Sequence, residues 1–167
     1  MTEKIYRSYL EIRSLGELKE VKKPAENYSV ELADPKDFQL NKFFYKTIGK
    51  NCQWIDRLIW TDLNWIDYIS NDQLFTYILK DKSEIAGYFE LLFNKQSKEA
   101  EIAYFGILEE YYGKKLGGHL LSEAIKISFD MRCERVWVHT CSLDHKHALK
   151  NYLARGMKIF KSETIIR

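Results

Sequence analysis

The chain has 167 residues, of which 46% are hydrophobic and 30% are charged. This length and balance predict one folded domain with its own core rather than a disordered chain. The formal net charge is only +2, and the basic residues form no stripe of the kind that nucleic-acid binding needs. No apolar run approaches the roughly 20 residues of a membrane span. We therefore expect no nucleic-acid partner and no membrane partner.

The cysteines and the N-terminal residues bear on the compartment. Cys52, Cys133 and Cys141 are widely spaced and odd in number, which suits a reducing environment better than a disulfide framework. Residues 1–13 carry charges where a signal peptide has an apolar stretch. Together these features predict a cytoplasmic protein.

The first elements in chain order divide the sequence into an N-terminal appendage, residues 1–27, and a main domain, residues 28–167. Residues 6–12 alternate enough to form an extra strand, and the charged residues 19–27 form a linker. The main domain begins with a strand at 28–33. Asp34-Pro35 then predicts a helix start, and Gly49 predicts the end of that helix. A second helix is expected at 62–69.

The rest of the chain alternates between strands and helices. Strands at 73–79, 85–93 and 100–108 are separated by polar turns of hairpin size, which predicts an antiparallel meander. An amphipathic helix at 115–132 follows, then a strand at 135–140, a helix at 145–155 and a last strand at 157–163. The predicted fold class is α/β, with a mixed, mostly antiparallel central sheet flanked by helices.

A glycine-rich turn precedes the helix expected at 115–132. Glycines at 113, 117 and 118 let the backbone turn tightly and approach a ligand closely. Free N–H groups at the start of a helix suit a pyrophosphate, and Lys114 and Lys115 add positive charge. On this segment alone, a simple strand-to-helix turn with solvated lysines is the alternative. The spacing matches neither a P-loop nor a dinucleotide fingerprint.

This turn resembles the acetyl-CoA pyrophosphate loop of the GNAT superfamily of acetyltransferases. The family pattern is Arg or Gln, two residues, Gly, one residue, then Gly or Ala. Gly117 fits its last position. Tyr112 stands where Arg or Gln is usual, and Lys115 stands where Gly is usual.

The C-terminal stretch, residues 136–160, resembles the strand–helix–strand that ends the GNAT fold. The family pattern there is Asn, two residues, Ala, then an aromatic-Tyr pair, then Gly and an apolar residue. Ala148, Tyr152, Gly156 and Met157 match it, while His145 stands at the Asn position and Asn151 at the first aromatic position. The run His-Thr-Cys-Ser-Leu-Asp-His at 139–145 and the strand Glu-Ile-Ala-Tyr-Phe-Gly at 101–106 also resemble a bacterial GNAT subgroup. The resemblance extends from residue 28 to the C-terminus.

The resemblance implies a GNAT-like acyl-CoA N-acyltransferase fold and a function as an N-acetyltransferase. The acetyl group of acetyl-CoA would move to a primary amine by direct attack in a ternary complex. The implied cofactor-binding residues are Phe105, Gly106, Ile107, Tyr112, Gly113, Lys114, Lys115, Leu116, Gly117, Gly118, His119, His145, Ala148 and Tyr152.

Tyr152 is also the implied acid that protonates the CoA thiolate, although it equally belongs to the apolar face of its helix. Glu101 is the first choice for a base and Glu90 the second, and a water molecule is the alternative to both. The resemblance also implies a possible homodimer.

The acceptor pocket is expected near the first two helices. An acid beside aromatic rings suits a cationic amine. Charged and aromatic residues lie close together in this part of the sequence, at Trp54, Arg57, Trp60, Asp62 and Trp65. The alternative is that these tryptophans belong to the core. A protein N-terminus, a lysine, an aminoglycoside and a polyamine all stay open as acceptors.

Three other interpretations compete with this one. His139, Cys141, His145 and His147 lie within nine residues, but their spacing matches no standard zinc pattern, so we expect no metal. A non-catalytic acyl-CoA binding or sensing module would explain the departures at positions 112 and 115. A pure interaction domain would bind no CoA at all.

Overall fold

The computed structural model describes residues 2–166 and builds them around a seven-stranded sheet. Its strands are β1 (Lys4–Ile12), β2 (Tyr28–Leu32), β3 (Leu74–Asp81), β4 (Glu84–Asn94), β5 (Glu99–Ile107), β6 (Arg135–Cys141) and β7 (Lys158–Ile166). Their order is β2-β3-β4-β5-β6-β1-β7, and every pair is antiparallel except β5 with β6. The predicted mixed, mostly antiparallel sheet is confirmed.

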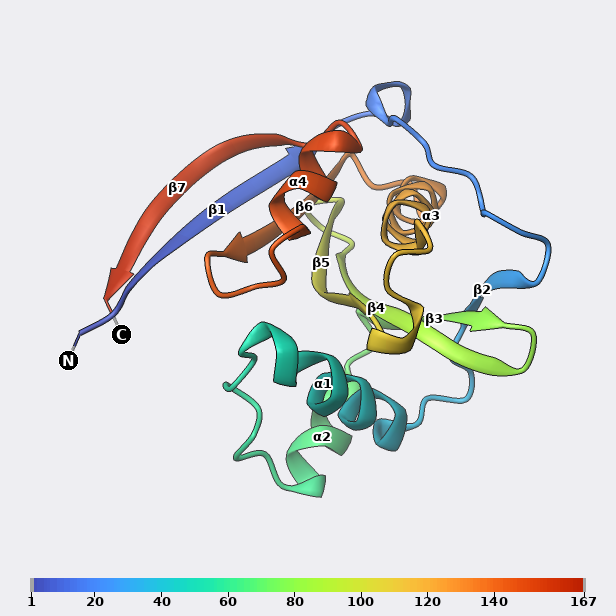
Figure 1. The fold of residues 1–167 in the computed structure, drawn as a ribbon, viewed down its shortest axis with the longest axis vertical. Coiled ribbons are helices and arrows are strands. Elements are labelled where there is room, and N and C mark those ends of the chain that lie inside the picture. The colour runs from blue at the N-terminus through green and yellow to red at the C-terminus, as the bar shows by residue number, and fades with distance from the viewer. Residues whose placement is uncertain (1, 167) are drawn as a thin grey trace.

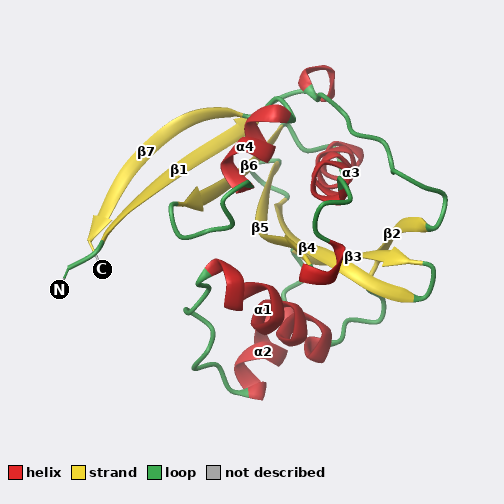
Figure 2. Ribbon diagram, viewed as in Figure 1, coloured by secondary structure: helices red, strands yellow, loops and turns green. Residues whose placement is uncertain are grey.

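The helices of the described residues lie on both faces of this sheet (Figures 1 and 2). They are α1 (Phe38–Cys52), α2 (Asp62–Ile69), α3 (Leu116–Asp130), α4 (Ala148–Ala154) and the 3-10 turns η1 (Leu15–Glu17) and η2 (Glu109–Tyr111). The pair α1 and α2 covers one face, and α3 and α4 cover the other (Figure 1). Within residues 2–166, no helix is long and apolar enough to cross a membrane.

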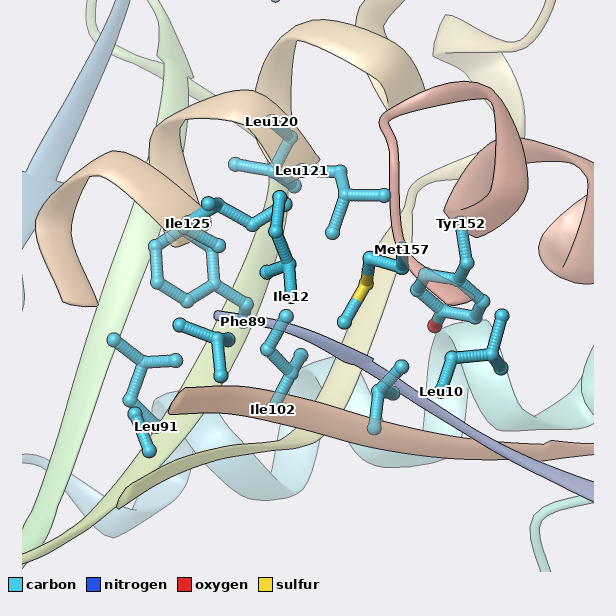
Figure 3. Packing of buried hydrophobic residues seen from close by; sticks show 14 of the residues in the cluster. Leu10, Ile12, Phe89, Leu91, Ile102, Leu120, Leu121, Ile125, Tyr152 and Met157 are labelled. Atoms are coloured by element: carbon cyan, nitrogen blue, oxygen red, sulfur yellow. The ribbon is translucent and has the colours of Figure 1, made fainter. Parts of the chain in front are cut away.

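The larger core lies between α3 and the middle of the sheet. Leu120, Leu121 and Ile125 of α3 are fully buried and belong to one cluster with Phe89 and Ile102 of the strands (Figure 3). Burying each such side chain contributes about 1.5–3 kcal/mol. This packing fixes the first turn of α3 against the end of β5, and so positions the glycine-rich turn between them.

The strand expected at residues 6–12 is present as β1, and it lies inside the sheet between β6 and β7. Leu10 pairs with Val138 of β6 on one side and with Ile159 of β7 on the other. Leu10 and Ile12 are also fully buried. The N-terminal segment therefore contributes both hydrogen bonds and core side chains to the sheet.

Both predicted ends of the first helix were wrong. Asp37, not Asp34, caps α1 and accepts a hydrogen bond of 3.0 Å from the Gln39 N–H. Gly49 lies within the helix, which ends at Cys52 and is followed by the C-cap Gln53, a residue with a left-handed φ of 54°. The helix expected at 145–155 is also shorter than predicted, because α4 begins at Ala148. The meander β3–β4–β5 and the helix at 62–69 are confirmed.

Candidate functional site

A cleft opens where β5 and β6 stop pairing. Their parallel pairing is confined to Glu99–Glu101 with Arg135–Trp137. The residues that follow in both strands line a cavity of about 1340 Å³, together with the α1–α2 loop, the start of α3 and the β6–α4 loop. The ladder between β4 and β5 also shifts register here: Leu91 pairs with Ile102 but Glu90 pairs with Tyr104, so the pairing skips Ala103. Such an irregularity bends a strand and re-aims its side chains.

The glycine-rich turn forms one end of this cleft. Gly113 and Lys115 both have left-handed φ values, 77° and 64°, a backbone conformation that occurs in anion-binding turns. Lys115 is the N-cap of α3, and its side chain caps no helix N–H. The first N–H groups of a helix have no partner within the helix. Those of α3 are therefore available to an anion at this end of the cleft.

Positive side chains surround the same end. The cleft wall there includes Lys115, Lys146, Lys150 and Arg155. Asn151 of α4 donates a hydrogen bond of 3.1 Å to the Gly117 carbonyl, and Arg155 donates one of 2.9 Å to Asn151. These bonds hold α4 beside the first turn of α3. The arrangement suits a ligand with several phosphates, and we call this part of the cleft the anion end.

Tyr152 lies in the middle of the cleft wall. Its side chain is 6% exposed, and its ring centroid is 6.3 Å from that of Phe105 on β5. Figure 3 shows the ring among core side chains beside Met157. A phenol is protonated at neutral pH, and burial raises the pKa of Tyr152 further. A protonated phenol beside a cleft is able to donate a proton.

Glu101 lies across the cleft from the anion end, at the last position where β5 still pairs with β6. Among residues 2–166 it has no ion-pair partner within 4.0 Å. Burial raises the pKa of Glu101, and the positive charge of Arg57 partly opposes that effect. A cation brought into the cleft would therefore stabilise the charged form of the Glu101 carboxylate.

Glu90, the second choice for a base, is fully buried and is not part of the cleft wall. Its carboxylate accepts hydrogen bonds from Tyr68 at 2.6 Å and Asn41 at 2.8 Å, and its ion pair with Arg57 is 3.4 Å long. Burial lowers the pKa of the Arg57 guanidinium, but Glu90 and the nearby tyrosines raise it by more. On balance the pKa of Arg57 lies above its ordinary value. Glu90 thus serves to neutralise a buried cation.

The aromatic cluster expected to hold the acceptor amine holds Arg57 instead. The guanidinium carbon lies 4.1–5.6 Å from the centroids of Tyr45, Trp60, Trp65, Tyr68 and Tyr104. Asp62, the acid expected beside these rings, is exposed and pairs with Lys42 at 2.9 Å. Only Trp54 and Arg57 of the predicted acceptor residues line the cleft. The alternative, that these tryptophans belong to the core, holds for the fully buried Trp65, and the cluster surrounds a cation of the protein itself.

The cleft wall brings together most of the residues singled out in the sequence. They are Glu101, Phe105, Gly106, Ile107, Tyr112, Gly113, Lys115, Leu116, Gly117, Gly118, His145, Ala148 and Tyr152. Two predicted cofactor residues lie outside it. Lys114 does not line the cleft, and His119 is buried, with Nδ1 3.2 Å from the Val21 carbonyl oxygen.

Asp144 is a cleft residue whose contacts were not predicted. It accepts hydrogen bonds from the Trp54 indole at 3.2 Å, from the Cys141 N–H at 3.1 Å and from the Thr140 hydroxyl. It therefore ties the segment that follows α1 to the β6–α4 loop. Among residues 2–166, no group of three or more His, Cys, Asp or Glu side chains is placed to hold a metal ion.

The chain is similar to known acetyltransferases in sequence pattern and in fold. The model of the acetyltransferase (GNAT) family matches residues 39–157. No curated protein sequence matches the chain.

Many solved structures share the fold. A GCN5-related N-acetyltransferase from Sphaerobacter thermophilus is 13% identical with a TM-score of 0.68, and the match covers 97% of this chain and 50% of that one. An aminoglycoside acetyltransferase from an uncultured soil metagenomic sample, solved with trehalose, is 14% identical with a TM-score of 0.63. That match covers 77% of this chain and 87% of the other.

A functionally unknown protein from Staphylococcus epidermidis is 13% identical with a TM-score of 0.66, and the match covers 99% of this chain and 62% of that one. The chain thus spans only half to about three fifths of the length of several structures that it matches. At these identities the likeness shows the fold alone.

Proposed function

The chain belongs to the acetyltransferase (GNAT) family, and from that premise we propose that it transfers the acetyl group of acetyl-CoA to a primary amine by direct attack in a ternary complex. One observation carries the proposal. A single cleft joins an end lined by helix N–H groups and cations to an end lined by carboxylates, with a buried tyrosine between them.

The anion end suits the phosphates of CoA. The backbone around Gly113 and Lys115 offers N–H groups, while Lys146, Lys150 and Arg155 supply charge. Residues 105–107 of β5 then lie along the cleft wall toward the carboxylates. A backbone N–H in this stretch would polarise the thioester carbonyl, as an oxyanion-binding donor does.

Tyr152 is the proposed acid. When the amine nitrogen bonds to the acetyl carbon and the carbon–sulfur bond breaks, the departing thiolate takes the phenol proton. The phenolate then recovers a proton, through water, from the nitrogen that has become the amide. No proton is gained or lost in this exchange. Because the pKa of a phenol lies well above neutral pH, and burial raises that of Tyr152 further, the phenol is protonated again before the next turnover.

Glu101 is the proposed base. A primary amine arrives mainly as an ammonium ion at neutral pH and must lose one proton before it can attack. A carboxylate beside the cleft attracts the ammonium and accepts that proton, which later passes to solvent. The raised pKa of Glu101 brings its basicity closer to what this transfer needs. We call the part of the cleft at Glu101 the acceptor end.

Thermal-shift and calorimetric titration with acetyl-CoA tests the proposal, with wild type beside Gly117→Trp and Tyr152→Phe. A Cβ on Gly117 would meet only Asn151 at an ordinary 3.6 Å, so the variant is expected to fold while its indole fills the anion end. We expect wild type and Tyr152→Phe to bind and Gly117→Trp not to bind. An amine panel with product detection then tests transfer.

The outcomes separate the proposal from its main rival. No binding by wild type at millimolar acetyl-CoA refutes the acetyl-CoA site. Tight binding without transfer to any amine of the panel favours a non-catalytic acyl-CoA binding module. Tyr112 and Lys115, which depart from the family pattern in the loop, are the feature that makes this rival worth testing.

A further inference from the structure

Asp144 accepts hydrogen bonds from two sides of the cleft. One carboxylate oxygen accepts from the Cys141 N–H at 3.1 Å and from the Thr140 hydroxyl, both at the end of β6. The other oxygen accepts from the Trp54 indole at 3.2 Å, in the α1–α2 loop at residues 53–61. Figure 1 shows the end of α1 next to the loop between β6 and α4. We call the bond between Trp54 and Asp144 the clasp, because it joins these two loops.

The Trp54 side of the clasp is held in place by the helix and the rings behind it. The Trp54 N–H donates a hydrogen bond of 3.0 Å to the Gly49 carbonyl. A Cβ at Gly49 would come within 3.1 Å of the indole ring, so the ring lies directly on α1. Its centroid is 4.8 Å from that of Tyr104 and 5.7 Å from that of Tyr45. These contacts restrict the indole, so little conformational entropy is lost when it bonds to Asp144.

Contacts continue from Trp54 to the acceptor end. The ring of Tyr104 lies between the Trp54 indole and the Arg57 guanidinium, whose carbon is 4.2 Å from the Tyr104 centroid. Arg57 belongs to the same loop as Trp54, and its charge lowers the pKa of Glu101 against the larger effect of burial. The position of the α1–α2 loop therefore decides where this charge lies relative to the proposed base.

The Asp144 side of the clasp belongs to the part of the cleft that suits the cofactor. The β6–α4 loop, residues 142–147, continues into Lys146 at the anion end and then into α4, which carries Tyr152. Burial, and after it the negative charge of Asp144, raise the pKa of the Tyr152 phenol. Among residues 2–166, Asp144 makes no ion pair within 4.0 Å. Its charge is thus stabilised by its hydrogen-bond donors, of which Trp54 is the one from the other loop.

We propose that Asp144 is a positioning residue, and that its bond to Trp54 couples the cofactor side of the cleft to the acceptor end. Acetyl-CoA orders the β6–α4 loop, and the clasp then holds the α1–α2 loop where an acceptor amine meets Glu101. Asp144 and Trp54 act through the two loops and not on the reacting atoms. This inference rests on the proposed function, since it concerns how the same site is assembled.

Hydrogen–deuterium exchange of the full chain, with and without CoA, tests the coupling without any acceptor. In wild type, saturating CoA should slow amide exchange in residues 53–61 by roughly tenfold, the change that one hydrogen bond to a charged group supplies. Trp54→Phe keeps an aromatic ring and loses the indole N–H. In this variant CoA should still slow exchange in residues 142–147 but leave residues 53–61 unchanged. Trp60→Phe is the matched control, because Trp60 lies in the same loop and does not line the cleft; it should behave as wild type.

Steady-state kinetics, with an amine that wild type acetylates, measures the consequence for the reaction. Trp54→Phe should raise KM for the amine by roughly tenfold and leave kcat and the Kd for acetyl-CoA nearly unchanged. Asp144→Ala should raise both KM for the amine and the Kd for acetyl-CoA, since Cys141 and Thr140 lose their acceptor as well. Asp144→Asn keeps an acceptor oxygen and should lie between Asp144→Ala and wild type. Adding Trp54→Phe to Asp144→Ala should raise KM no further, because both changes remove the same bond.

The results distinguish failure of this inference from failure of the proposed function. CoA-dependent protection of residues 53–61 in Trp54→Phe equal to that in wild type overturns the clasp, and so does an unchanged KM for the amine. A fall in Tm and in the number of binding sites, with KM unchanged, shows a structural role only and also overturns it. Coupled exchange without acetylation of any amine overturns the proposed function and leaves the clasp in place.

Discussion

Lys115 occupies a backbone conformation that favours glycine, and this makes a sharp prediction about the anion end. Its φ is 64°, in the left-handed region, at the N-cap of α3. A non-glycine residue there costs roughly 1–2 kcal/mol, while glycine costs about 0.5–1 kcal/mol through backbone entropy. Lys115→Gly should therefore stabilise the protein by about 0.5–1 kcal/mol.

The same substitution should weaken acetyl-CoA binding. Lys115 lines the cleft at the anion end, and an exposed ion pair is worth about 0.5–1 kcal/mol, which is roughly a two- to fivefold change in Kd. In a chain of this length, the expected gain in stability is a rise in Tm of roughly 1–4 °C. Thermal denaturation without ligand and calorimetric titration with acetyl-CoA measure the two effects separately.

Neighbouring residues supply the controls. Lys114 has no left-handed φ and does not line the cleft, so Lys114→Gly should lower stability and leave affinity unchanged. Gly113 has a φ of 77° and open space around it, so Gly113→Ala should lose stability through backbone strain alone. A fall in Tm for Lys115→Gly similar to that for Lys114→Gly would refute the reasoning.

The remaining predictions concern the residues proposed to carry protons and the buried ion pair. Tyr152→Phe should lower kcat by roughly 100-fold or more with the Kd for acetyl-CoA unchanged, as measured by product formation and calorimetry. For wild type, kcat/KM should rise with pH through the raised pKa of Glu101, and Glu101→Gln should abolish that rise. Since the raised pKa favours the protonated folded state, stability from Glu101 is lost as pH rises, so Glu101→Gln should melt higher than wild type at pH 7. Arg57→Leu should cost about 3–5 kcal/mol in chemical denaturation by leaving Glu90 unpaired, and a smaller loss would show that water reaches Glu90.

Local patterns predicted the elements whose ends and faces are set by nearby residues. The meander β3–β5 follows from strand alternation and polar turns, and α2 matches its predicted range. The predicted start of α1 was wrong because Asp34 and Asp37 both precede the apolar run, and the sequence pattern does not show which of the two caps the helix. The inner place of β1 depends on pairing with β6 and β7, more than 120 residues later in the chain, which short-range periodicity does not record.

The same distinction explains the site. The glycine-rich turn and Tyr152 lie in segments with a recognisable local pattern, and the structure places both at the cleft. The contacts of Asp144 with Trp54 and of Arg57 with Glu90 join residues 90 and 33 positions apart. The local sequence shows aromatic residues, Arg57 and Asp62 in one segment. It does not show that β4 brings Glu90 close to Arg57, so that Glu90 rather than Asp62 is the acid in the cluster.

The filled aromatic cluster constrains where an acceptor's charge is able to go. Five rings and Glu90 hold the Arg57 guanidinium at the base of the α1–α2 loop, so this loop is anchored by a cation of the protein. An incoming ammonium group would have to displace that guanidinium to enter the cluster, and would leave it buried without Glu90. The carboxylate of Glu101, the proposed base, would offer the ammonium group a partner without that cost. For this reason the proposed acceptor site lies at Glu101 and not among the aromatic rings, whose cation is Arg57.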